Sequence, residues 1–291
     1  MTSFLRRVVA LCKPRIVLLL VVTGAAGAWK AADASPDALV LLTVVIAGAL
    51  AAGGANAINQ GLDADIDTVM RRTRVRPVPA QQMSAQSAAG IGVVLVGSAT
   101  ALMAVGANAL AAALTLAAAA VYVLVYTMLL KRRSWNNIVI GGAAGAFPPL
   151  IGAAAVAGEV TAPGLYMFAF IFFWTPPHFW TLSMLLREDY AAANVPMLAA
   201  VAEQRDTARQ VLLYVLLLGA MAWLPLAAGY AGVTFAVVTT LLSIIWLRKS
   251  WPLLDGGTAT KTLAAYKYSL LYLALVFVTL AIEPMLPWYA Q

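Results

Sequence analysis

Residues 38–58 read ALVLLTVVIAGALAAGGANAI, and residues 59–77, which follow directly, read NQGLDADIDTVMRRTRVRP. The first stretch has no charged residue, whereas the second has three acids and four arginines. About 20 apolar residues in a helix cross the roughly 30 Å hydrocarbon core of a bilayer, so residues 38–58 predict a transmembrane helix. Charged side chains at the end of such a helix cost free energy and by default indicate a functional site.

The whole chain has the composition of an integral membrane protein. Its 291 residues are 63% hydrophobic and 11% charged, with a mean hydropathy of +0.86, which excludes an ordinary soluble domain. Because long polar tracts are missing, we expect one intramembrane domain over residues 1–291. Polar, Gly and Pro breaks predict an all-α bundle of nine transmembrane helices, at about 15–32, 38–58, 86–105, 108–130, 137–156, 162–186, 209–228, 231–247 and 264–283.

The basic residues test this count, because cytoplasmic segments of membrane proteins are enriched in Lys and Arg. With a cytoplasmic N-terminus, 18 of the 19 basic residues fall in inner segments and only Lys30 falls outside. The net charge of +7 is therefore a sign of topology, and nucleic acid is not an expected partner.

The N-terminus has a second interpretation. Basic residues, an apolar run from Ile16 and the small residues Ala32 and Ala34 are also typical of a cleavable secretory signal. The apolar run is long enough to span a bilayer, so we expect it to be the first transmembrane helix. The single cysteine, Cys12, excludes a disulfide framework.

Asn59, Asp63 and Asp67 recur every four residues and so share one side of a helix. Two carboxylates at this spacing repel each other, and a divalent cation would remove the repulsion. Mg²⁺ is commonly held by one or two carboxylates together with substrate phosphates, and we interpret these residues as an open Mg²⁺ site. Asp65 points away from them and is expected to be solvated or paired with an arginine.

Arginines just downstream fit the phosphates of such a substrate. Arg72 and Arg76 are close to the acids, and a guanidinium binds phosphate oxygens through two parallel hydrogen bonds. A plainer interpretation is a cytoplasmic loop in which acids balance a topological excess of basic residues. The spacing alone leaves both interpretations open.

A second polar cluster lies in WTPPHFWTLSMLLREDY, residues 174–190. The Pro176-Pro177 pair removes two backbone donors and predicts a bent or broken helix. His178, the only histidine, is either a hydrogen-bonded packing residue or a functional one. Asp189 and Tyr190 follow at the inner surface, where Asp189 is expected to face the acidic residues.

A third polar group ends the fourth predicted helix, where Tyr126 is followed by Lys131, Arg132 and Arg133. The two arginines have a plain interpretation as inner flanking charges. The glycines of the following GGAAG, residues 141–145, have the spacing of close helix packing and are interpreted as structural.

Several of these motifs together resemble a known family. The acidic residues, followed by Arg72-Thr73 and Arg76-Pro77, are similar to the first aspartate-rich motif of the UbiA superfamily of intramembrane prenyltransferases. The resemblance covers nearly the whole chain. Four further motifs resemble the haem-farnesylating branch of that superfamily: KPR at 13–15, NNIVIGGAAGAFPPLIG at 136–152, WTPPHFW at 174–180 and DYAAANVPML at 189–198.

The resemblance implies a nine-helix bundle around a central cavity in the bacterial cytoplasmic (inner) membrane, with the active site toward the cytoplasm. It implies Mg²⁺ on the acidic motif and transfer of farnesyl from farnesyl diphosphate to a vinyl group of haem B, with addition of water, to give haem O. Membrane lipid, and haem A synthase or terminal-oxidase assembly factors, are the further implied partners. Many members carry a second DxxxD motif, but here Leu185 and Ala193 flank Asp189, which stands alone.

Roles for single residues follow under this resemblance. Basic groups would stabilise the departing diphosphate, aromatic rings would stabilise the allylic cation, and a dry cavity would exclude water. His178 would accept a proton from the added water or contact the haem. The predicted metal ligands are Asn59, Asp63 and Asp67; the predicted catalytic residues are Asp63, Asp67, His178 and Asp189; the predicted substrate-binding residues are Asn59, Arg72, Arg76, Lys131, Tyr126, Arg15, Tyr190 and Trp180.

Two other functions stay open. A member of the superfamily could use an aromatic acid or quinone precursor as acceptor, as 4-hydroxybenzoate polyprenyltransferases do, although the single Asp189 and the setting of His178 disfavour it. A transporter could also place polar groups at a broken helix. Against a transporter, the polar clusters gather on one face of the membrane and the two halves of the sequence show no repeat.

Overall fold

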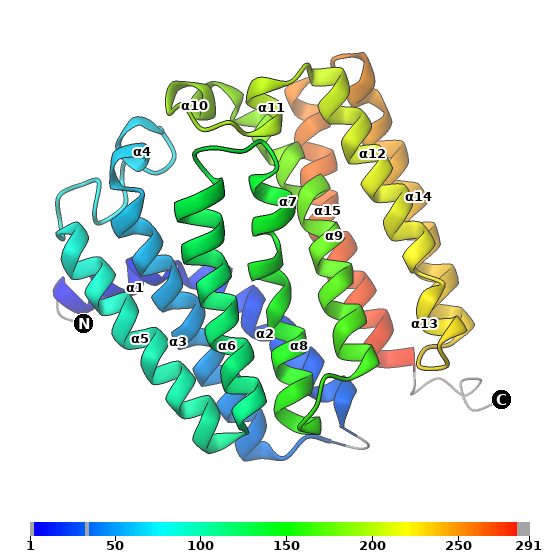
Figure 1. Cartoon of the computed structure of the whole chain (residues 1–291). Helices are drawn as coiled ribbons and strands as arrows, with labels where there is room; N and C mark the ends of the chain where they lie inside the picture. Colours follow the sequence, from blue (N-terminus) through cyan, green and yellow to red (C-terminus); the bar gives the residue numbers. More distant parts are fainter. Residues whose placement is uncertain (1–2, 33–34, 284–291) are drawn as a thin grey trace.

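The computed structural model describes residues 3–32 and 35–283, whose long helices stand side by side in one bundle (Figure 1). All regular structure in these residues is helical, which confirms the predicted all-α class. The long helices are α2 (Pro14–Ala31), α3 (Ala38–Leu62), α5 (Ala85–Gly106), α6 (Ala109–Ala120), α8 (Ala143–Ala157), α9 (Ala162–Leu185), α12 (Gln204–Met221), α14 (Val233–Ser250) and α15 (Ala259–Ile282).

Shorter elements extend or connect these helices. α4, α10 and α11 lie together at the top of Figure 1 and cover that end of the bundle. They belong to the two long polar loops that the sequence assigns to the cytoplasmic side. The short elements are α1 (Ser3–Cys12), α4 (Ala64–Val69), the π-helix η1 (Val121–Leu130), α7 (Asn137–Gly141), α10 (Arg187–Ala192), α11 (Leu198–Val201), α13 (Leu224–Ala227) and the 3₁₀-helix η2 (Trp251–Asp255).

Eight helical segments within residues 3–32 and 35–283 are long and apolar enough to cross a membrane, so the protein is an integral membrane protein. α9 is not among them, because its prolines, tryptophans and histidine lower its hydropathy. Its 24 residues nevertheless match the length of α15, and it packs between α8, α12 and α15. The count of nine crossings and the side of the N-terminus stay predictions.

Both turns that the lengths of the apolar segments require are present. Asn108 caps the start of α6, where its Oδ1 accepts a hydrogen bond from the Ala111 N–H at 2.8 Å. Gly229 has φ of 76° in the other turn, a conformation that favours glycine. Ala34, part of the alternative interpretation as a signal cleavage site, lies outside the described residues.

The sequence predicted a bend or a break at the Pro176-Pro177 pair. The break is wrong, because α9 runs without interruption from Ala162 to Leu185. Hydroxyl groups on either side of the pair donate hydrogen bonds to backbone carbonyls of the helix. Thr175 Oγ1 donates to the Ile171 carbonyl at 2.8 Å, and Thr181 Oγ1 donates to the His178 carbonyl at 2.7 Å. The acceptors of these bonds are not the carbonyls of Phe172 and Phe173, which are the ones that lose an N–H donor to the two prolines.

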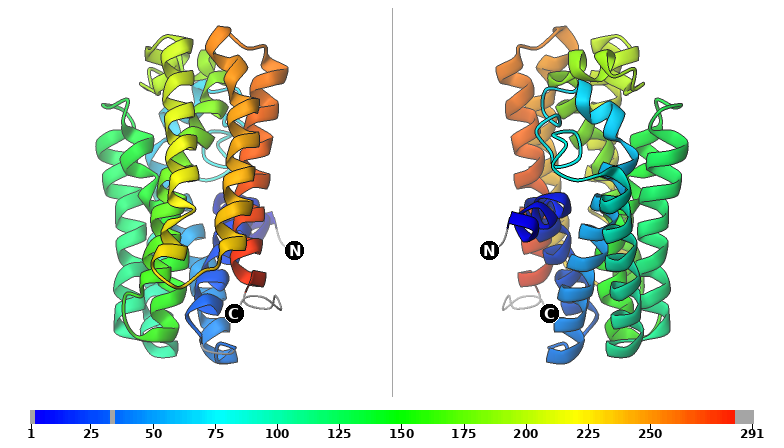
Figure 2. Two further views of the ribbon diagram at one scale, coloured as in Figure 1. Left: turned by 90° about the vertical axis from the view of Figure 1, so that its right-hand side faces the viewer. Right: turned by 90° about the vertical axis from the view of Figure 1, so that its left-hand side faces the viewer.

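Glycines bring α2 and α8 into backbone contact. A Cβ added at Gly152 would lie 1.9 Å from the Gly24 carbonyl oxygen, and one at Gly27 would lie 2.0 Å from that of Pro149. Any larger residue would push the two helices apart. Only this side of α2, with Gly24, Gly27 and Ala28, is buried, whereas Leu18, Leu19 and Val22 on its other side are exposed. The blue N-terminal segments lie in the lower half of both views in Figure 2.

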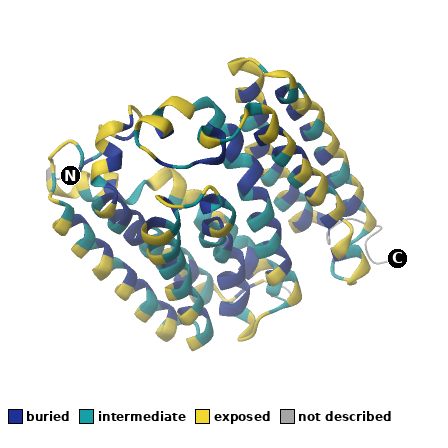
Figure 3. Ribbon diagram, turned by 45° about the horizontal axis from the view of Figure 1, so that its top comes forward, coloured by how far each residue is buried: buried dark blue, intermediate teal, exposed yellow. Residues whose placement is uncertain are grey.

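The core divides into an aromatic half and a small-residue half. Phe170, Trp246 and Tyr272 pack where α9, α14 and α15 meet, whereas mainly alanines fill the space between α3, α5, α6 and α8. Buried residues line the inward sides of the helices and exposed ones the outside (Figure 3). The outer surface is rich in exposed apolar side chains such as Leu18 and Val94, as expected where a helix faces lipid.

Candidate active site

The three oxygen-bearing residues at the end of α3 are buried together. Helix α3 ends at Leu62, and Asp63 joins it to α4. The Asp67 N–H donates to the Asp63 carbonyl at 2.8 Å, so the four-residue spacing continues through the junction. Asn59, Asp63 and Asp67 are 3%, 0% and 1% exposed, and buried carboxylates require charged or polar partners.

Asp63 has such partners on one of its two oxygens. Its Oδ2 accepts from Lys131 Nζ at 2.5 Å and from Asn59 Nδ2 at 2.6 Å. Its Oδ1 is buried without a hydrogen-bond partner in the described structure, and Arg132 Nη2 lies 3.7 Å from it. This leaves one carboxylate oxygen free to accept a further ligand.

Asp67 is held by the loop that follows it. Arg76 Nη1 lies 2.7 Å from Asp67 Oδ2, and Thr73 Oγ1 donates to the Asp67 carbonyl at 3.1 Å. The loop after α4 therefore turns back over the acids and places a guanidinium against the second carboxylate.

The π-helix η1 positions the residues opposite the acids. The Lys131 N–H donates to the Tyr126 carbonyl at 2.8 Å, a bond across five residues, and π-helical turns are frequent at functional sites. Thr127 Oγ1 accepts from Asn59 Nδ2 at 3.1 Å. The rings of Tyr122 and Tyr126 stack, with centroids 5.7 Å apart.

Lys13 joins this group, whereas the sequence favours its neighbour Arg15. Lys13 adopts a left-handed conformation (φ 52°) between α1 and α2, which is strained for a residue other than glycine. Its Nζ approaches Asn59 Oδ1 at 3.4 Å. Burial lowers the pKa of Lys13 to about 7, and the nearby charge of Arg76 acts in the same direction. Arg15 is exposed instead.

Asp65 lies outside the buried group and pairs with an arginine, as expected from the sequence. Arg132 donates to both of its oxygens, at 2.6 Å and 2.7 Å. These hydrogen bonds lower the pKa of Asp65 to about 2. Arg132 therefore bridges the buried Asp63 and the exposed Asp65.

Asp189 and Tyr190 lie on α10, next to the loop that follows α4. Asp189 Oδ1 is 4.0 Å from Arg71 Nε, so its nearest cation is exposed and the pair is loose. Burial raises the pKa of the Tyr190 phenol, against the charge of Arg72 and a hydrogen bond from it. Tyr190 packs in one cluster with Ile66 of α4, which ties α10 to the acidic end of the bundle.

His178 lies in a separate polar group between α9 and α15. Its ring stacks on Trp174 and on Tyr266, with centroids 4.3 Å and 5.0 Å away. Its Nδ1 is 2.7 Å from Ser269 Oγ. The single hydroxyl proton of Ser269 is donated to the Tyr266 carbonyl at 2.6 Å, so His178 must be the donor in the first contact. Nε2 then carries the lone pair.

Trp180 is not brought to the acidic residues. Its side chain is 1% exposed in the aromatic core, where it meets the ring of Tyr214 on α12 edge to face. The WTPPHFW motif therefore divides between the His178 group and the core, because residues two apart on a helix point to different sides.

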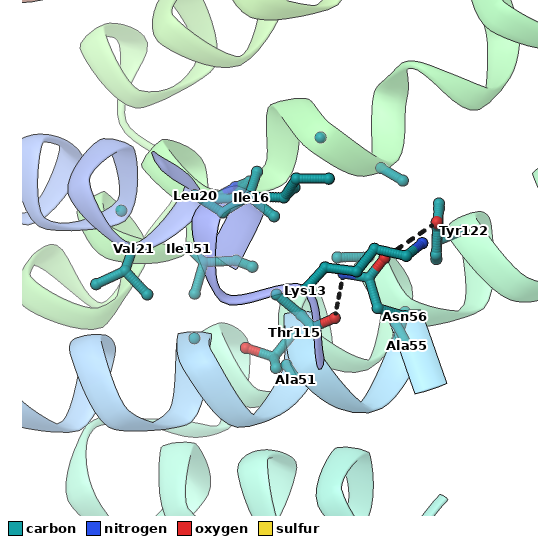
Figure 4. Close-up of a pocket in the computed structure, with 18 of the residues that line it drawn as sticks. Lys13, Ile16, Leu20, Val21, Ala51, Ala55, Asn56, Thr115, Tyr122 and Ile151 are labelled. Atoms are coloured by element: carbon teal, nitrogen blue, oxygen red, sulfur yellow. Dashed lines mark hydrogen bonds between the residues drawn. The ribbon is translucent and has the colours of Figure 1, made fainter. Parts of the chain in front are cut away.

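An apolar cavity of about 240 Å³ lies between α2, α3, α6 and α8. Its polar lining residues are few and include Lys13, Asn56 and Tyr122. Tyr122 OH donates to Asn56 Oδ1 at 3.3 Å, and Lys13 reaches toward this pair (Figure 4). Lys13 therefore connects the cavity with the acidic residues.

Fold and site together define a polytopic helical membrane protein with buried acids and surrounding cations at one end of an apolar chamber. The chain belongs to the UbiA prenyltransferase family, whose sequence profile matches residues 20–289. The fold agrees with a solved UbiA homolog from Archaeoglobus fulgidus bound to DMAPP and Mg²⁺. The TM-score is 0.70 at 14% identity, over 95% of this chain and 99% of that one.

Two curated relatives carry the name protoheme IX farnesyltransferase. The protein of Trichodesmium erythraeum is 43% identical over 94% of this chain and 84% of its own length. The protein of Thermus thermophilus is 46% identical over 96% of this chain, which spans 46% of that longer relative.

Proposed function

We propose that the protein is an intramembrane prenyltransferase that transfers farnesyl from farnesyl diphosphate to a vinyl group of haem B. The relatives named above support this acceptor. The observation that carries the proposal is the buried Asn59, Asp63 and Asp67 group, surrounded by cations and adjoining an apolar cavity. A substrate with a long apolar tail and a charged head needs both the apolar cavity and the charged group beside it.

The acidic group fits Mg²⁺. Asp63 Oδ1 is a buried carboxylate oxygen without a hydrogen bond, and Asn59 and Asp67 add the oxygen ligands that Mg²⁺ prefers. No three His, Cys, Asp or Glu side chains within residues 3–32 and 35–283 form a cage, as suits a metal shared with substrate phosphates. When bound, Mg²⁺ would neutralise charge on the leaving diphosphate.

The surrounding basic residues would bind the diphosphate. Lys131 and Arg76 now neutralise the two carboxylates, and they are placed to interact with phosphate oxygens beside them. Lys13 would reach the same head group from the cavity side, and Arg72 from the loop. Such donors stabilise the charge that develops as the carbon–oxygen bond breaks.

The carbon chemistry requires a water-free space. Cleavage of the C1–O bond releases diphosphate and leaves an allylic cation, which the vinyl carbon attacks. The charge then lies beside the porphyrin ring, where water adds and loses a proton. The stacked faces of Tyr122 and Tyr126 would stabilise the first cation, and the apolar cavity would keep water away from it.

His178 would contact the acceptor. Its Nε2 lone pair is free while Nδ1–H is fixed by Ser269, the arrangement typical of a histidine that ligates a metal. We assign it to the haem iron in preference to proton transfer. The setting is the bacterial cytoplasmic membrane with the acidic end toward the cytoplasm, where haem A synthase or oxidase assembly factors would accept the product.

The experiment gives purified protein farnesyl diphosphate and Mg²⁺ with haem B, and separately with 4-hydroxybenzoate. Release of diphosphate with haem B, together with a farnesylated haem in the extract, is the expected result. Release only with 4-hydroxybenzoate would assign the chain to the aromatic prenyltransferases. Release with neither acceptor would reject the proposal.

A further inference from the structure

The apolar cavity has a defined direction along the bundle. On α3, Asn56 lines the end nearer the acids and Val44 lines the other end. On η1 and α6, Tyr122 and Thr115 line the same two ends. The chamber thus has one end toward the acidic residues, which follow Asn56 on α3, and its other end toward the start of that helix.

The far end of the chamber is closed by packed side chains. Val44 and Ile151 line the cavity, and both belong to the buried cluster of small and medium residues that also contains Ala47, Met103 and Ala111. Val44 is 3% and Ile151 8% exposed. They form a floor with protein behind it.

The depth of the chamber matches a chain of limited length. The 12 residues from Asn56 to Val44 on α3 correspond to about 18 Å at 1.5 Å per residue. An extended geranyl, farnesyl or geranylgeranyl chain is about 9, 14 or 19 Å long, estimated from carbon–carbon bonds of about 1.5 Å. With the diphosphate at the acids and C1 below it at the level of Asn56, a farnesyl chain ends above the floor, whereas a geranylgeranyl chain reaches it.

We infer that Val44 and Ile151 determine the length of the prenyl chain that the protein accepts, with a C15 chain as the longest that fits. The inference rests on the proposed function, since it assumes a prenyl diphosphate with its head at the acidic residues. One extra methylene in a hydrophobic pocket changes specificity about 10-fold or more, and one isoprene unit adds five carbons.

Gly48 allows the chamber to be shortened. It lines the cavity one helical turn above Val44, and a Cβ added there would meet only a Val21 methyl at 3.9 Å. A larger side chain at this position therefore projects into open space. Gly48→Leu should exclude a C15 chain and still admit a C10 chain. Gly97→Leu is the matched control, because Gly97 is exposed on α5 with no atom within 4 Å.

Ile151 allows the chamber to be deepened. Ile151→Ala removes part of the floor and should admit a C20 chain. Ile171→Ala is the matched control, because Ile171 is 4% exposed in the aromatic core and does not line the cavity. Both changes create a cavity in packed protein, but only the first one enlarges the chamber.

The test measures binding of geranyl, farnesyl and geranylgeranyl thiodiphosphates to detergent-solubilised protein with Mg²⁺ and without haem. We expect wild type and both controls to bind the C20 analogue about tenfold more weakly than the C15 analogue. Ile151→Ala should abolish that difference, and Gly48→Leu should weaken C15 binding about tenfold relative to C10.

Equal chain-length ratios in wild type, Ile151→Ala and Gly48→Leu would overturn the inference. Each variant is first checked for a single peak in gel filtration. If only one of Ile151→Ala and Gly48→Leu passes, that variant alone is sufficient for the comparison with wild type. Failure of wild type to bind any of the three analogues would reject the proposed function itself. Binding that does not depend on chain length would reject only the role of Val44 and Ile151 in setting that length.

Discussion

The ammonium group of Lys131 lies 2.5 Å from Oδ2 of Asp63, although 68 residues separate the two in the chain. Both side chains are nearly inaccessible, at 11% and 1% exposure. Such a pair contributes little net stability, but the loss of one partner leaves a buried charge without compensation. The pair can therefore be tested for stability and for activity separately.

Lys131→Met should lower the free energy of unfolding by about 3–5 kcal/mol, because Asp63 would lose its closest cation. The double variant Asp63→Asn/Lys131→Met should recover most of this loss, since neither charge then remains buried alone. Denaturant titration of the purified protein in detergent measures both values. A double variant as unstable as Lys131→Met would contradict the account of the pair.

Asp63→Asn should lower the rate of diphosphate release at least about 100-fold, because it removes the carboxylate that is expected to bind Mg²⁺. Asp65→Asn is the control, because Asp65 is exposed and pairs with Arg132. Its rate should stay within about threefold of wild type, as for most surface substitutions. Similar losses in the two variants would show that the rate of diphosphate release depends on the overall charge of this region and not on the buried carboxylate.

Ser269→Ala should weaken haem B binding about 10- to 100-fold, because the hydroxyl fixes the His178 ring and its tautomer. His178→Ala should remove the iron-ligand signature from the absorption spectrum of the bound haem. Ser243→Ala is the control, because Ser243 is equally buried and bonds to Tyr272 at 3.0 Å. Ser269→Thr keeps a hydroxyl and should restore binding.

An unchanged haem spectrum in His178→Ala would move the role of this residue to proton transfer or to packing. The two alternatives differ in their readouts. A packing role predicts loss of stability without a change in haem affinity, and a proton-transfer role predicts slower product formation with normal haem binding.

The sequence predicted the helices well, because apolar length and turn residues determine where a chain leaves the membrane. It also predicted that Asn59, Asp63 and Asp67 share one side, since the spacing of four is local. The structure retains that spacing through the junction at Asp63, where α3 ends.

Contacts that depend on backbone detail could not be predicted. The register of Lys131 against Asp63 depends on the π-helix η1, which no residue pattern indicates. Lys13, and not Arg15, joins the acidic group because Lys13 adopts a left-handed conformation before Pro14. Local backbone preferences disfavour this conformation, so the sequence did not predict it. Trp180 lies in the core because α9 continues through its prolines as one helix, so the position of each ring follows helical rotation.

Gly141→Ala tests how closely the π-helix must fit. A Cβ at Gly141 would lie 2.3 Å from Cδ2 of Tyr126, so the ring must move, and with it the stack on Tyr122. We expect a loss of about 1–3 kcal/mol in the free energy of unfolding and a fall of about tenfold or more in diphosphate release.

Gly90→Ala is the control for Gly141→Ala. Gly90 is exposed on α5 and has no atom within 4 Å of an added Cβ, so alanine should stabilise the helix by up to about 1 kcal/mol. Both changes are glycine to alanine at residues that belong to a helix, Gly141 at the end of α7 and Gly90 within α5. A Gly141→Ala protein as stable and active as Gly90→Ala would mean that Tyr126 is free to move and that its position does not matter for the reaction.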